Sequence, residues 1–290
     1  MSHRILRLSK WLLLFTLWLS VPLSTAAVAQ ETSSAPRARI LLTNDDGIDS
    51  PAFVALLTEL RSFSDVVISA PATNMSGMGQ GYTISHKDVR VNQMRDSSGV
   101  LRLTVYGTPA DATLYALTSQ PRFDLVISGI NMGLNPGSIS WISGTVGAAR
   151  QAALLGTPAI AISQEANAQG QYDFTLAARY VAQLARYAVA RPERWPLLLS
   201  INVPDAPIGV VLAKAESAWP RSYGAPRETG RDASGDFLYQ LNATNLDPQD
   251  KKADRFALAE HKITITHLTL DPNAKQKKLP LMLMSLPAAK

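Results

Sequence analysis

Short apolar runs alternate with helix-like segments along most of the chain. Residues 101–106 alternate apolar with polar side chains, which is typical of a half-buried strand or of the edge of a sheet. Buried strands are predicted by runs rich in β-branched residues, bounded by polar, glycine-containing loops, at 39–43, 66–70, 125–128, 159–163 and 197–203. Apolar side chains recur at helical spacing between these runs, which predicts helices near 51–60, 108–118, 145–155 and from 173 onward.

Residues suited to helix starts precede these helical segments. Ser50 and Pro51 suit the N-cap and the first position of the first helix. Thr108 and Asp111 have the spacing of a capping box, and Asp173 is placed to cap the longest helix. Strands that alternate with helices in this way predict an α/β fold, Rossmann-like, with a mostly parallel sheet covered by helices on both faces.

The regular alternation does not continue to the C-terminus. The later sequence is rich in turns and contains two further strand patterns, at 237–241 and 263–268. We interpret residues 204–271 as C-terminal β-hairpin excursions that project from the sheet and serve oligomerisation, and residues 272–290 as a tail. The apolar part of this tail, 279–287, is too short to span a membrane, so we expect an extra edge strand or a contact surface there.

The N-terminal segment has the features of a secretory signal peptide. A basic region ending at Lys10 is followed by an apolar stretch, and the small residues Ala27 and Ala29 supply the pattern of a cleavage site. We therefore expect cleavage after residue 29, a linker over 30–38 and export to the periplasm. The alternative interpretation is an uncleaved membrane anchor, and without any signal the protein would be cytoplasmic.

Composition narrows the range of possible partners. The 290-residue chain has a formal net charge of +5, which falls to +2 without the three basic residues of the signal segment. Outside the tail no stripe of lysine or arginine remains, which argues against a nucleic-acid partner. The chain has no cysteine, so it has neither a disulfide framework nor a thiolate metal site. After signal cleavage we expect no stable membrane association.

Polar loops follow four of the predicted strands, at 44–47, 74–77, 107–111 and 128–145. In parallel sheets the carboxyl ends of the strands meet at one edge, where ligands bind. The adjacent carboxylates Asp45 and Asp46 repel each other unless a cation lies on them, and oxygen ligands of this kind suit Mg²⁺ or Mn²⁺. The predicted helix starts at Thr108 and Thr145 offer backbone N–H groups to a phosphate.

Each of these motifs is a weak signal by itself, because Asn-Asp-Gly and Thr-Pro are common in turns and helix starts. Together they resemble the SurE family, the stationary-phase survival proteins that act as metal-dependent nucleotidases. Five motifs carry the resemblance in the same order along the chain: Asn-Asp-Asp-Gly at 44–47, Asn-x-Ser-Gly at 74–77, Gly-Thr-Pro-x-Asp at 107–111, Ser-Gly-Ile-Asn at 128–131 and Ser-Gly-Thr-Val at 143–146. The likeness extends over about residues 39–271, which we expect to be the phosphatase domain.

The resemblance implies a role for individual residues. It places one divalent ion, Mg²⁺ or Mn²⁺, in each subunit. The metal ligands that it implies are Asp45, Asp46, Ser76 and Asn131, and the phosphate-binding residues are Gly77, Ser143, Gly144 and Thr145. Of these, Asp45, Asp46 and Asn131 are the expected catalytic residues.

The resemblance also implies an activity and an assembly. We expect a divalent-metal-dependent phosphomonoesterase, a 5'-nucleotidase, that converts nucleoside monophosphates to nucleoside and phosphate by a metal-activated water. Family members form homodimers or homotetramers through the C-terminal excursion. Two alternatives stay open: an exported, phosphate-scavenging acid phosphatase of broad specificity, and a non-catalytic periplasmic protein that binds phosphorylated solutes.

The chain departs from the family pattern around the expected substrate pocket. Met75 replaces a residue that is usually long and polar, and Trp141 and Ile142 lie in a segment that usually carries acids and a tyrosine. These three side chains make a more apolar pocket wall, which suits stacking on a base. The alternative is that Trp141 and Ile142 pack at a subunit interface.

Overall fold

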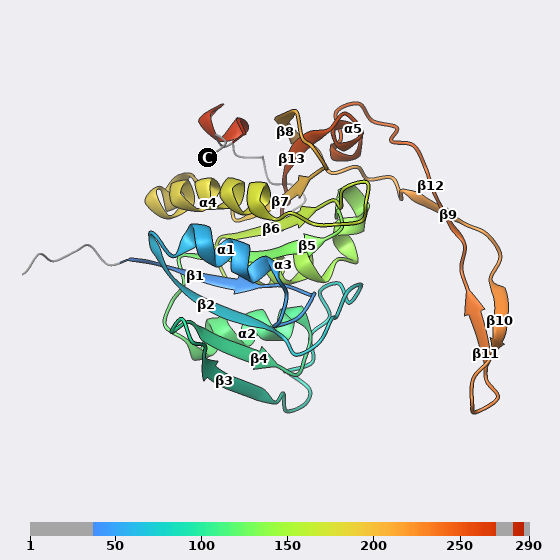
Figure 1. Ribbon diagram of the computed structural model, residues 1–290, viewed down its shortest axis with the longest axis horizontal. Coiled ribbons are helices and arrows are strands. Elements are labelled where there is room, and N and C mark those ends of the chain that lie inside the picture. Colours follow the sequence, from blue (N-terminus) through green and yellow to red (C-terminus); the bar gives the residue numbers. More distant parts are fainter. Residues whose placement is uncertain (1–36, 271–280, 287–290) are drawn as a thin grey trace, which may run out of the picture. The chain divides into compact units, whose positions relative to one another are not determined.

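The computed structural model describes residues 37–270 and 281–286 of the chain (Figure 1). The predicted signal peptide, most of the linker and the tail residues 271–280 and 287–290 lie outside the described residues. Within the described part, no helix is both long enough and apolar enough to cross a membrane.

A nine-stranded sheet forms the centre of the described fold, in the order β3-β4-β2-β1-β5-β6-β7-β13-β8 (Figure 1). Its strands are β1 (Ala38–Thr43), β2 (Ser64–Pro71), β3 (Val91–Arg95), β4 (Leu101–Val105), β5 (Leu125–Met132), β6 (Ala159–Gln164), β7 (Leu198–Val203), β8 (Gly209–Ala213) and β13 (Lys262–His267). The six strands from β4 to β7 run parallel, whereas β3 pairs antiparallel with β4 and β13 pairs antiparallel with β7. The predicted α/β fold with a mostly parallel sheet is therefore confirmed.

Helices cover both faces of the sheet, as the sequence predicts. Side chains of α1 (Ala52–Leu60) and α4 (Thr175–Ala190) share one apolar cluster with Ile40 and Leu42 of β1. Side chains of α2 (Pro109–Ser119) and α3 (Gly144–Leu154) share a second cluster with Leu41. Because successive residues of a strand point to opposite faces, this central strand contributes to both cores.

The helix start predicted at Thr108 is confirmed in atomic detail. The Thr108 hydroxyl accepts a hydrogen bond from the Asp111 backbone N–H at 3.1 Å, and the Asp111 carboxylate accepts one from the Thr108 N–H at 2.9 Å. The other predicted start, at Ser50, is wrong: α1 begins after Pro51, and the buried Ser50 hydroxyl has no hydrogen-bond partner among the described residues. At α4 the N-cap is Phe174, although the preceding Asp173 still accepts from the Thr175 N–H.

The strand predicted at 101–106 is confirmed as β4, and it is half-buried rather than the edge, because the short exposed strand β3 lies outside it. The prediction that all of residues 204–271 project from the sheet is too broad. Strands β8 and β13 continue the sheet beyond β7, and α5 (Asp254–Ala259) contacts β13.

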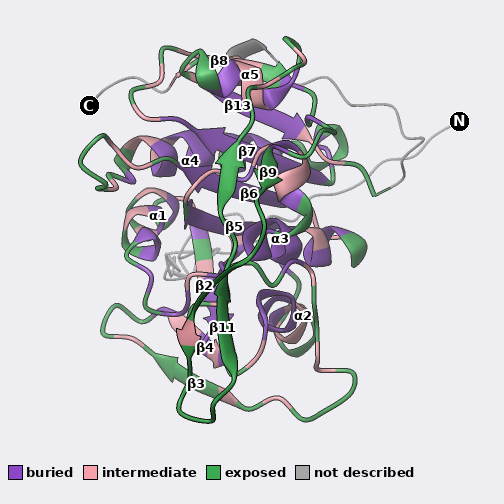
Figure 2. Ribbon diagram, turned by 90° about the vertical axis from the view of Figure 1, so that its right-hand side faces the viewer, coloured by how far each residue is buried: buried purple, intermediate pink, exposed green. Residues whose placement is uncertain are grey.

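The excursion itself is limited to residues 221–245, which we call the arm. It contains two antiparallel pairs, β9 (Arg221–Tyr223) with β12 (Ala243–Asn245) and β10 (Arg227–Arg231) with β11 (Phe237–Gln240). Almost every residue of the arm is exposed, as Figure 2 shows.

The described part of the tail forms a 3₁₀ helix rather than an edge strand. This helix, η3 (Leu281–Met284), follows two earlier short ones, η1 (Gly137–Trp141) and η2 (Pro192–Arg194). Leu283 is fully buried in the core, and its carbonyl oxygen accepts a hydrogen bond of 2.7 Å from the buried Tyr180 hydroxyl. Residues 281–286 are therefore attached through core contacts, and this described part of the tail has no sheet pairing.

The capping box of α2 supports a stability prediction. We expect Thr108→Ala to lower the free energy of unfolding by about 1 kcal/mol, since it leaves the N–H of the third helical residue without its acceptor. The measurement is urea unfolding followed by circular dichroism. Thr118→Ala is the matched control on the same helix, because that exposed hydroxyl only donates to Leu114 and Tyr115 carbonyls. Equal losses in both variants would contradict the assignment.

Candidate functional site

The site lies at the carboxyl ends of β1 and β5, in the middle of the sheet. From β1 the chain builds β2 and β4 on one side, and it later builds β5, β6 and β7 on the other. A sheet whose strand order reverses in this way leaves a crevice beyond the strand ends, where ligands bind in folds of this class. The loops after β1, β2 and β5 and the start of α3 meet here.

The turn after β1 is held by its own asparagine. The buried Asn44 side chain donates to the Gly47 carbonyl oxygen at 3.0 Å and accepts from the Gly47 N–H at 3.1 Å. The Asp45 carbonyl oxygen accepts from the Met75 N–H at 2.7 Å, which ties the loop after β2 to this turn. The two aspartates are thus presented from a turn that is fixed on both sides.

Asp45 lies against the first turn of α3. Its carboxylate accepts a hydrogen bond from the Thr145 hydroxyl, and the backbone N–H groups of Gly144 and Thr145 also lower its pKa. Burial outweighs these contacts and raises the pKa of Asp45 above its ordinary value. A Cβ atom at Gly144 would lie 2.7 Å from the Asp45 Cβ, so only glycine permits this approach.

The neighbouring Asp46 carboxylate has fewer hydrogen-bond partners than that of Asp45. Burial and the negative charge of Asp45 raise the pKa of Asp46 to about 6, and a hydrogen bond from the Met132 N–H offsets this only in part. Its Oδ2 atom is buried and has no hydrogen-bond partner among the described residues. In the part of the chain that the structure describes, neither aspartate forms an ion pair with lysine or arginine. A buried carboxylate oxygen of this kind requires a positive partner.

Asn131 and Ser76 are the chain neighbours of two residues that bind the aspartates, since Met132 donates to the Asp46 carboxylate and Met75 donates to the Asp45 carbonyl oxygen. The register of β5 against β6 shifts between Ser128 and Asn131, and such a bulge redirects the side chains at the end of a strand. The Asn131 amide nitrogen donates to the Gly133 carbonyl oxygen at 2.7 Å, so its own amide oxygen is the atom suited to a metal. Ser76 is exposed in the loop after β2, where its N–H donates to the Asn74 side chain.

The expected phosphate-binding residues lie at the start of α3 and in the loop after β2. The Ser143 hydroxyl caps α3 by accepting from the Val146 N–H at 3.1 Å. Gly77 is exposed in its loop. The Thr145 hydroxyl is already bound to Asp45, and the backbone N–H groups of Gly144 and Thr145 face the same carboxylate, so a phosphate bound here would share these N–H groups with Asp45.

The start of α2, the second helix start expected to bind phosphate, is closed. Asp111 fills it through the capping box and also accepts hydrogen bonds from the N–H groups of Thr83 and Ile84. These contacts hold the pKa of Asp111 below its ordinary value despite its burial. The loop at 107–111 therefore anchors the segment around Thr83, and the expectation of an open phosphate site at Thr108 is wrong.

The donor set at this edge is two carboxylates with neutral oxygens. Among the described residues, no group of three or more His, Cys, Asp or Glu side chains is placed to hold a metal. A site with two carboxylates, a hydroxyl and an amide oxygen suits a hard cation that keeps several of its waters, such as Mg²⁺ or Mn²⁺. The unpartnered Asp46 oxygen fits the same cation.

Two of the apolar side chains expected in the pocket wall are exposed. Trp141 is 70% exposed and Ile142 is 43% exposed, just before the start of α3. The Arg150 guanidinium lies over the Trp141 ring, 4.8 Å from its centroid, and fixes one face of the indole. Stacking on a base and packing at a subunit interface both remain predictions for these side chains.

A separate cavity of about 600 Å³ lies at the opposite edge of the sheet, beside the amino ends of β1, β2 and β4. Arginines line it, but neighbouring carbonyl groups already bind them. Arg37 donates to the carbonyls of Arg61 and Ser64, and Arg61 donates to that of Ser98. This cavity is far from the paired aspartates in the topology, so we do not assign the chemistry to it.

The pairing of Thr145 with Asp45 was missed by the sequence analysis. The two residues are separated by 100 positions, and the local sequence around either residue does not predict a contact with the other. Only the shared motif order along the chain indicated that these two loops belong to one site.

Comparisons of the sequence with known proteins give one family. Residues 40–222 match the family described as "Survival protein SurE". The protein named 5'-nucleotidase SurE from Methanopyrus kandleri is 37% identical over 244 residues, covering 80% of this chain and 92% of the relative. Its namesake from Deinococcus radiodurans is 36% identical over 250 residues, covering 84% and 91%.

A solved structure shows the same fold. The crystal structure of the SurE protein from Aquifex aeolicus superposes with a TM-score of 0.65 at 28% identity, and the match covers 81% of this chain and 94% of that one. The family match spans more than half of the sequence, and the relatives align over most of its length. The chain therefore belongs to the SurE family.

Proposed function

We propose that this protein is a 5'-nucleotidase that hydrolyses nucleoside monophosphates to nucleoside and phosphate. The observation that carries the proposal is a buried Asp46 carboxylate oxygen, beside Asp45 and the start of α3, for which the described residues provide no hydrogen-bond partner. A binding protein for phosphorylated solutes would gain nothing from two adjacent buried carboxylates. The SurE relatives that carry the name 5'-nucleotidase support the substrate class.

A divalent cation, Mg²⁺ or Mn²⁺, would be held by Asp45, Asp46, Ser76 and Asn131. Bound there, it would supply Lewis-acid polarisation of the phosphoryl group and a lowered pKa of water. Hydrogen bonds within the chain already hold these aspartates in place before a cation binds. Thr145 and the amides of α3 fix the orientation of Asp45, and the Met132 N–H restrains Asp46 at the end of β5.

The phosphate group would be held by Gly77, Ser143, Gly144 and Thr145. The start of α3 carries a partial positive charge, which attracts a dianionic phosphate and opposes its repulsion by the aspartates. The Ser143 hydroxyl keeps the first turn of α3 in shape by capping it. Backbone N–H groups that are fixed in this way can stabilise the charge of the transition state without reorganising.

The central test of this function is Asp46→Asn. We expect kcat/KM for phosphate release from AMP to fall at least about 100-fold, because a neutral amide replaces the carboxylate that would hold the cation. The measurement is release of inorganic phosphate from AMP, 3'-AMP and p-nitrophenyl phosphate, with and without EDTA. Asp49→Asn is the matched control, since Asp49 is an exposed aspartate in the adjoining turn.

The outcome of that assay separates the competing functions. Turnover that survives both EDTA and Asp46→Asn would exclude a metal-dependent reaction. Similar kcat/KM values for p-nitrophenyl phosphate and AMP would favour a phosphatase of broad specificity. Binding of AMP without any turnover by the wild-type protein would favour the non-catalytic alternative.

The raised pKa of Asp46 supports a prediction about pH. With a pKa of about 6, this carboxyl is mostly protonated at pH 5 and mostly ionised at pH 7. A cation must displace the proton, so we expect the affinity for Mn²⁺ to rise about tenfold between pH 5 and pH 7. The measurement is titration calorimetry with Mn²⁺ at both values and at pH 6, and an affinity independent of pH would contradict it.

The raised pKa of Asp46 also determines how the free energy of unfolding changes with pH. The folded chain binds this proton more tightly than the unfolded chain, whose aspartate has a pKa near 3.8. In the metal-free protein the contribution of Asp46 to stability is therefore greatest below about pH 4 and is lost as the pH rises through 6. Thermal unfolding with and without Mn²⁺ checks this, because the stabilisation by Mn²⁺ should be larger at pH 7 than at pH 5.

We further propose that the arm binds a second copy of the chain. An isolated pair of strands is marginally stable in water, yet the arm exposes a row of large apolar side chains. These are Tyr223, Phe237, Leu238, Tyr239 and Leu241, each of them about half exposed or more. A second subunit that covers them would account for an arm built in this way.

The arm proposal predicts the state of association. We expect Tyr239→Asp combined with Leu241→Asp to convert a dimer or tetramer into smaller species, since two charges would be buried without partners. The measurement is sedimentation equilibrium of the wild type and the variant. Val54→Asp is the control, because Val54 is 69% exposed on α1 and lies outside the arm. A wild-type monomer, or a variant of unchanged mass, would contradict the proposal.

A further inference from the structure

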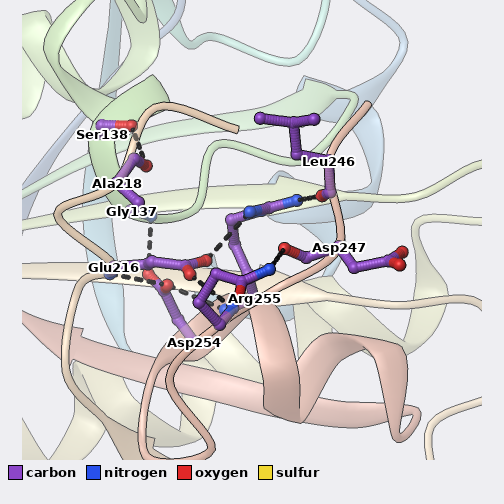
Figure 3. A network of polar contacts seen from close by, with 9 residues as sticks. Gly137, Ser138, Glu216, Ala218, Leu246, Asp247, Asp254 and Arg255 are labelled. Atoms are coloured by element: carbon purple, nitrogen blue, oxygen red, sulfur yellow. Dashed lines mark hydrogen bonds and ion pairs between the residues drawn. The ribbon is translucent and has the colours of Figure 1, made fainter. Parts of the chain in front are cut away.

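A buried polar cluster lies where the arm leaves the sheet (Figure 3). Asp254, the first residue of α5, is 1% exposed and accepts hydrogen bonds from three backbone N–H groups. Its Oδ1 accepts from Glu216 at 3.1 Å and from Arg255 at 2.8 Å, and its Oδ2 accepts from Gly137 at 2.7 Å. One carboxylate therefore joins three segments that are distant in the sequence.

The same cluster holds both ends of the arm. Glu216, on the outgoing side, is 4% exposed and forms an ion pair of 3.0 Å with Arg255. Its other carboxylate oxygen accepts from the Gln249 N–H at 2.9 Å, on the returning side. The Arg255 guanidinium also donates to the Leu246 carbonyl oxygen. The root of the arm is thus fixed by charged side chains in a buried environment.

On its other side, the cluster contacts the loop that leads into α3. Gly137 opens η1 with a φ of +51°, and a Cβ atom there would lie 2.7 Å from the Glu216 carbonyl oxygen. The next residue, Ser138, donates its hydroxyl to the Ala218 carbonyl oxygen at 2.9 Å, as Figure 3 shows. The loop is therefore packed directly against the outgoing side of the arm.

The loop is held at its beginning as well. The Asn135 N–H donates to the Asn202 side chain at 2.7 Å, and the Asn135 amide donates to the Ser163 hydroxyl at 2.9 Å. Between this anchor and the Ser143 cap of α3, two charged side chains bind the loop: Asp254 accepts from the Gly137 N–H at 2.7 Å, and the Arg150 guanidinium donates to the Ser140 carbonyl oxygen at 3.3 Å. Asp254 makes the shorter of these two contacts. A charged acceptor makes a hydrogen bond about twice as strong as a neutral one.

We propose that Asp254 is a positioning residue for the phosphate-binding start of α3. By holding Gly137 against the root of the arm, Asp254 fixes the loop that ends at Ser143 and so places Gly144 and Thr145 relative to Asp45. This inference rests on the proposed function for the phosphate-binding role of these residues. It also links the arm, where a second copy is proposed to bind, to the site through one buried carboxylate.

The variant Asp254→Asn isolates this role. An asparagine has one acceptor oxygen in place of two. In Asp254 one oxygen accepts from the Glu216 and Arg255 N–H groups, and the other accepts from Gly137 and, at 3.4 Å, from the Thr266 hydroxyl. The Thr266 hydroxyl can turn to accept from an amide N–H, whereas the three backbone N–H groups can only donate. We therefore expect the amide oxygen to face Glu216 and Arg255 and the contact with Gly137 to be lost. The affinity for inorganic phosphate should fall about tenfold, the effect of losing a charge-assisted hydrogen bond, while the affinity for Mn²⁺ stays within about twofold.

The measurement is titration calorimetry of the full protein with inorganic phosphate and, separately, with Mn²⁺. Hydrogen exchange of residues 137–143 on the protein alone provides a second readout and should become faster in Asp254→Asn. The matched control is Asp250→Asn in the same segment, where the carboxylate forms an exposed ion pair with Lys214. Gly137→Ala tests the contact from the side of the loop and should weaken phosphate binding in the same way, even if Asp254→Asn fails to fold.

Two results would overturn the inference: unchanged hydrogen exchange of the loop in both variants, or a loss of Mn²⁺ affinity that equals the loss of phosphate affinity. The second result would show general damage rather than positioning. A wild-type protein that fails to hydrolyse AMP would count against the proposed function alone, since the exchange and binding measurements require no turnover.

Discussion

The contact between the Asp45 carboxylate and the first turn of α3 is the interaction on which the site depends. Two adjacent aspartates in a buried turn repel each other, and burial makes both harder to ionise. The helix start and the Thr145 hydroxyl compensate one of them, and the absence of a side chain at Gly144 makes that approach possible. Asp46 keeps one buried carboxylate oxygen without a hydrogen-bond partner among the described residues, and the proposal of a metal-dependent reaction is built on this atom.

The fold brings these groups together through ordinary features of a parallel sheet. The strands end at one edge, and the reversal of strand order between β2, β1 and β5 opens a crevice at their carboxyl ends. Each loop is then fixed by a contact with another loop, such as the Met75 N–H on the Asp45 carbonyl. Closure of the α2 start by Asp111 leaves the start of α3 as the helix terminus that faces the paired aspartates. The distribution of charge therefore assigns separate roles to two similar helix starts.

The C-terminal part of the chain supports this arrangement from the other side of the loop before α3. Strands β13 and β8 extend the sheet, and the arm leaves from a root whose charged residues are buried. Because Asp254 binds both this root and Gly137, the surface proposed to hold a second subunit and the loop before α3 share one support. A change at the arm therefore has a short physical path to the residues proposed to bind phosphate, through backbone hydrogen bonds and not through the proposed metal ligands.

Local signals in the sequence determined the alternation of strands and helices, the capping box at Thr108 and Asp111, and the set of motifs that indicated the family. These depend on neighbours within a few positions, which is the range over which periodicity and capping act. The pairing of Thr145 with Asp45, the addition of β8 and β13 to the sheet and the burial of Leu283 beside Tyr180 were decided by the tertiary structure. Each of these joins residues that are far apart in the chain, and their energy comes from packing and burial that exist only after the sheet has formed.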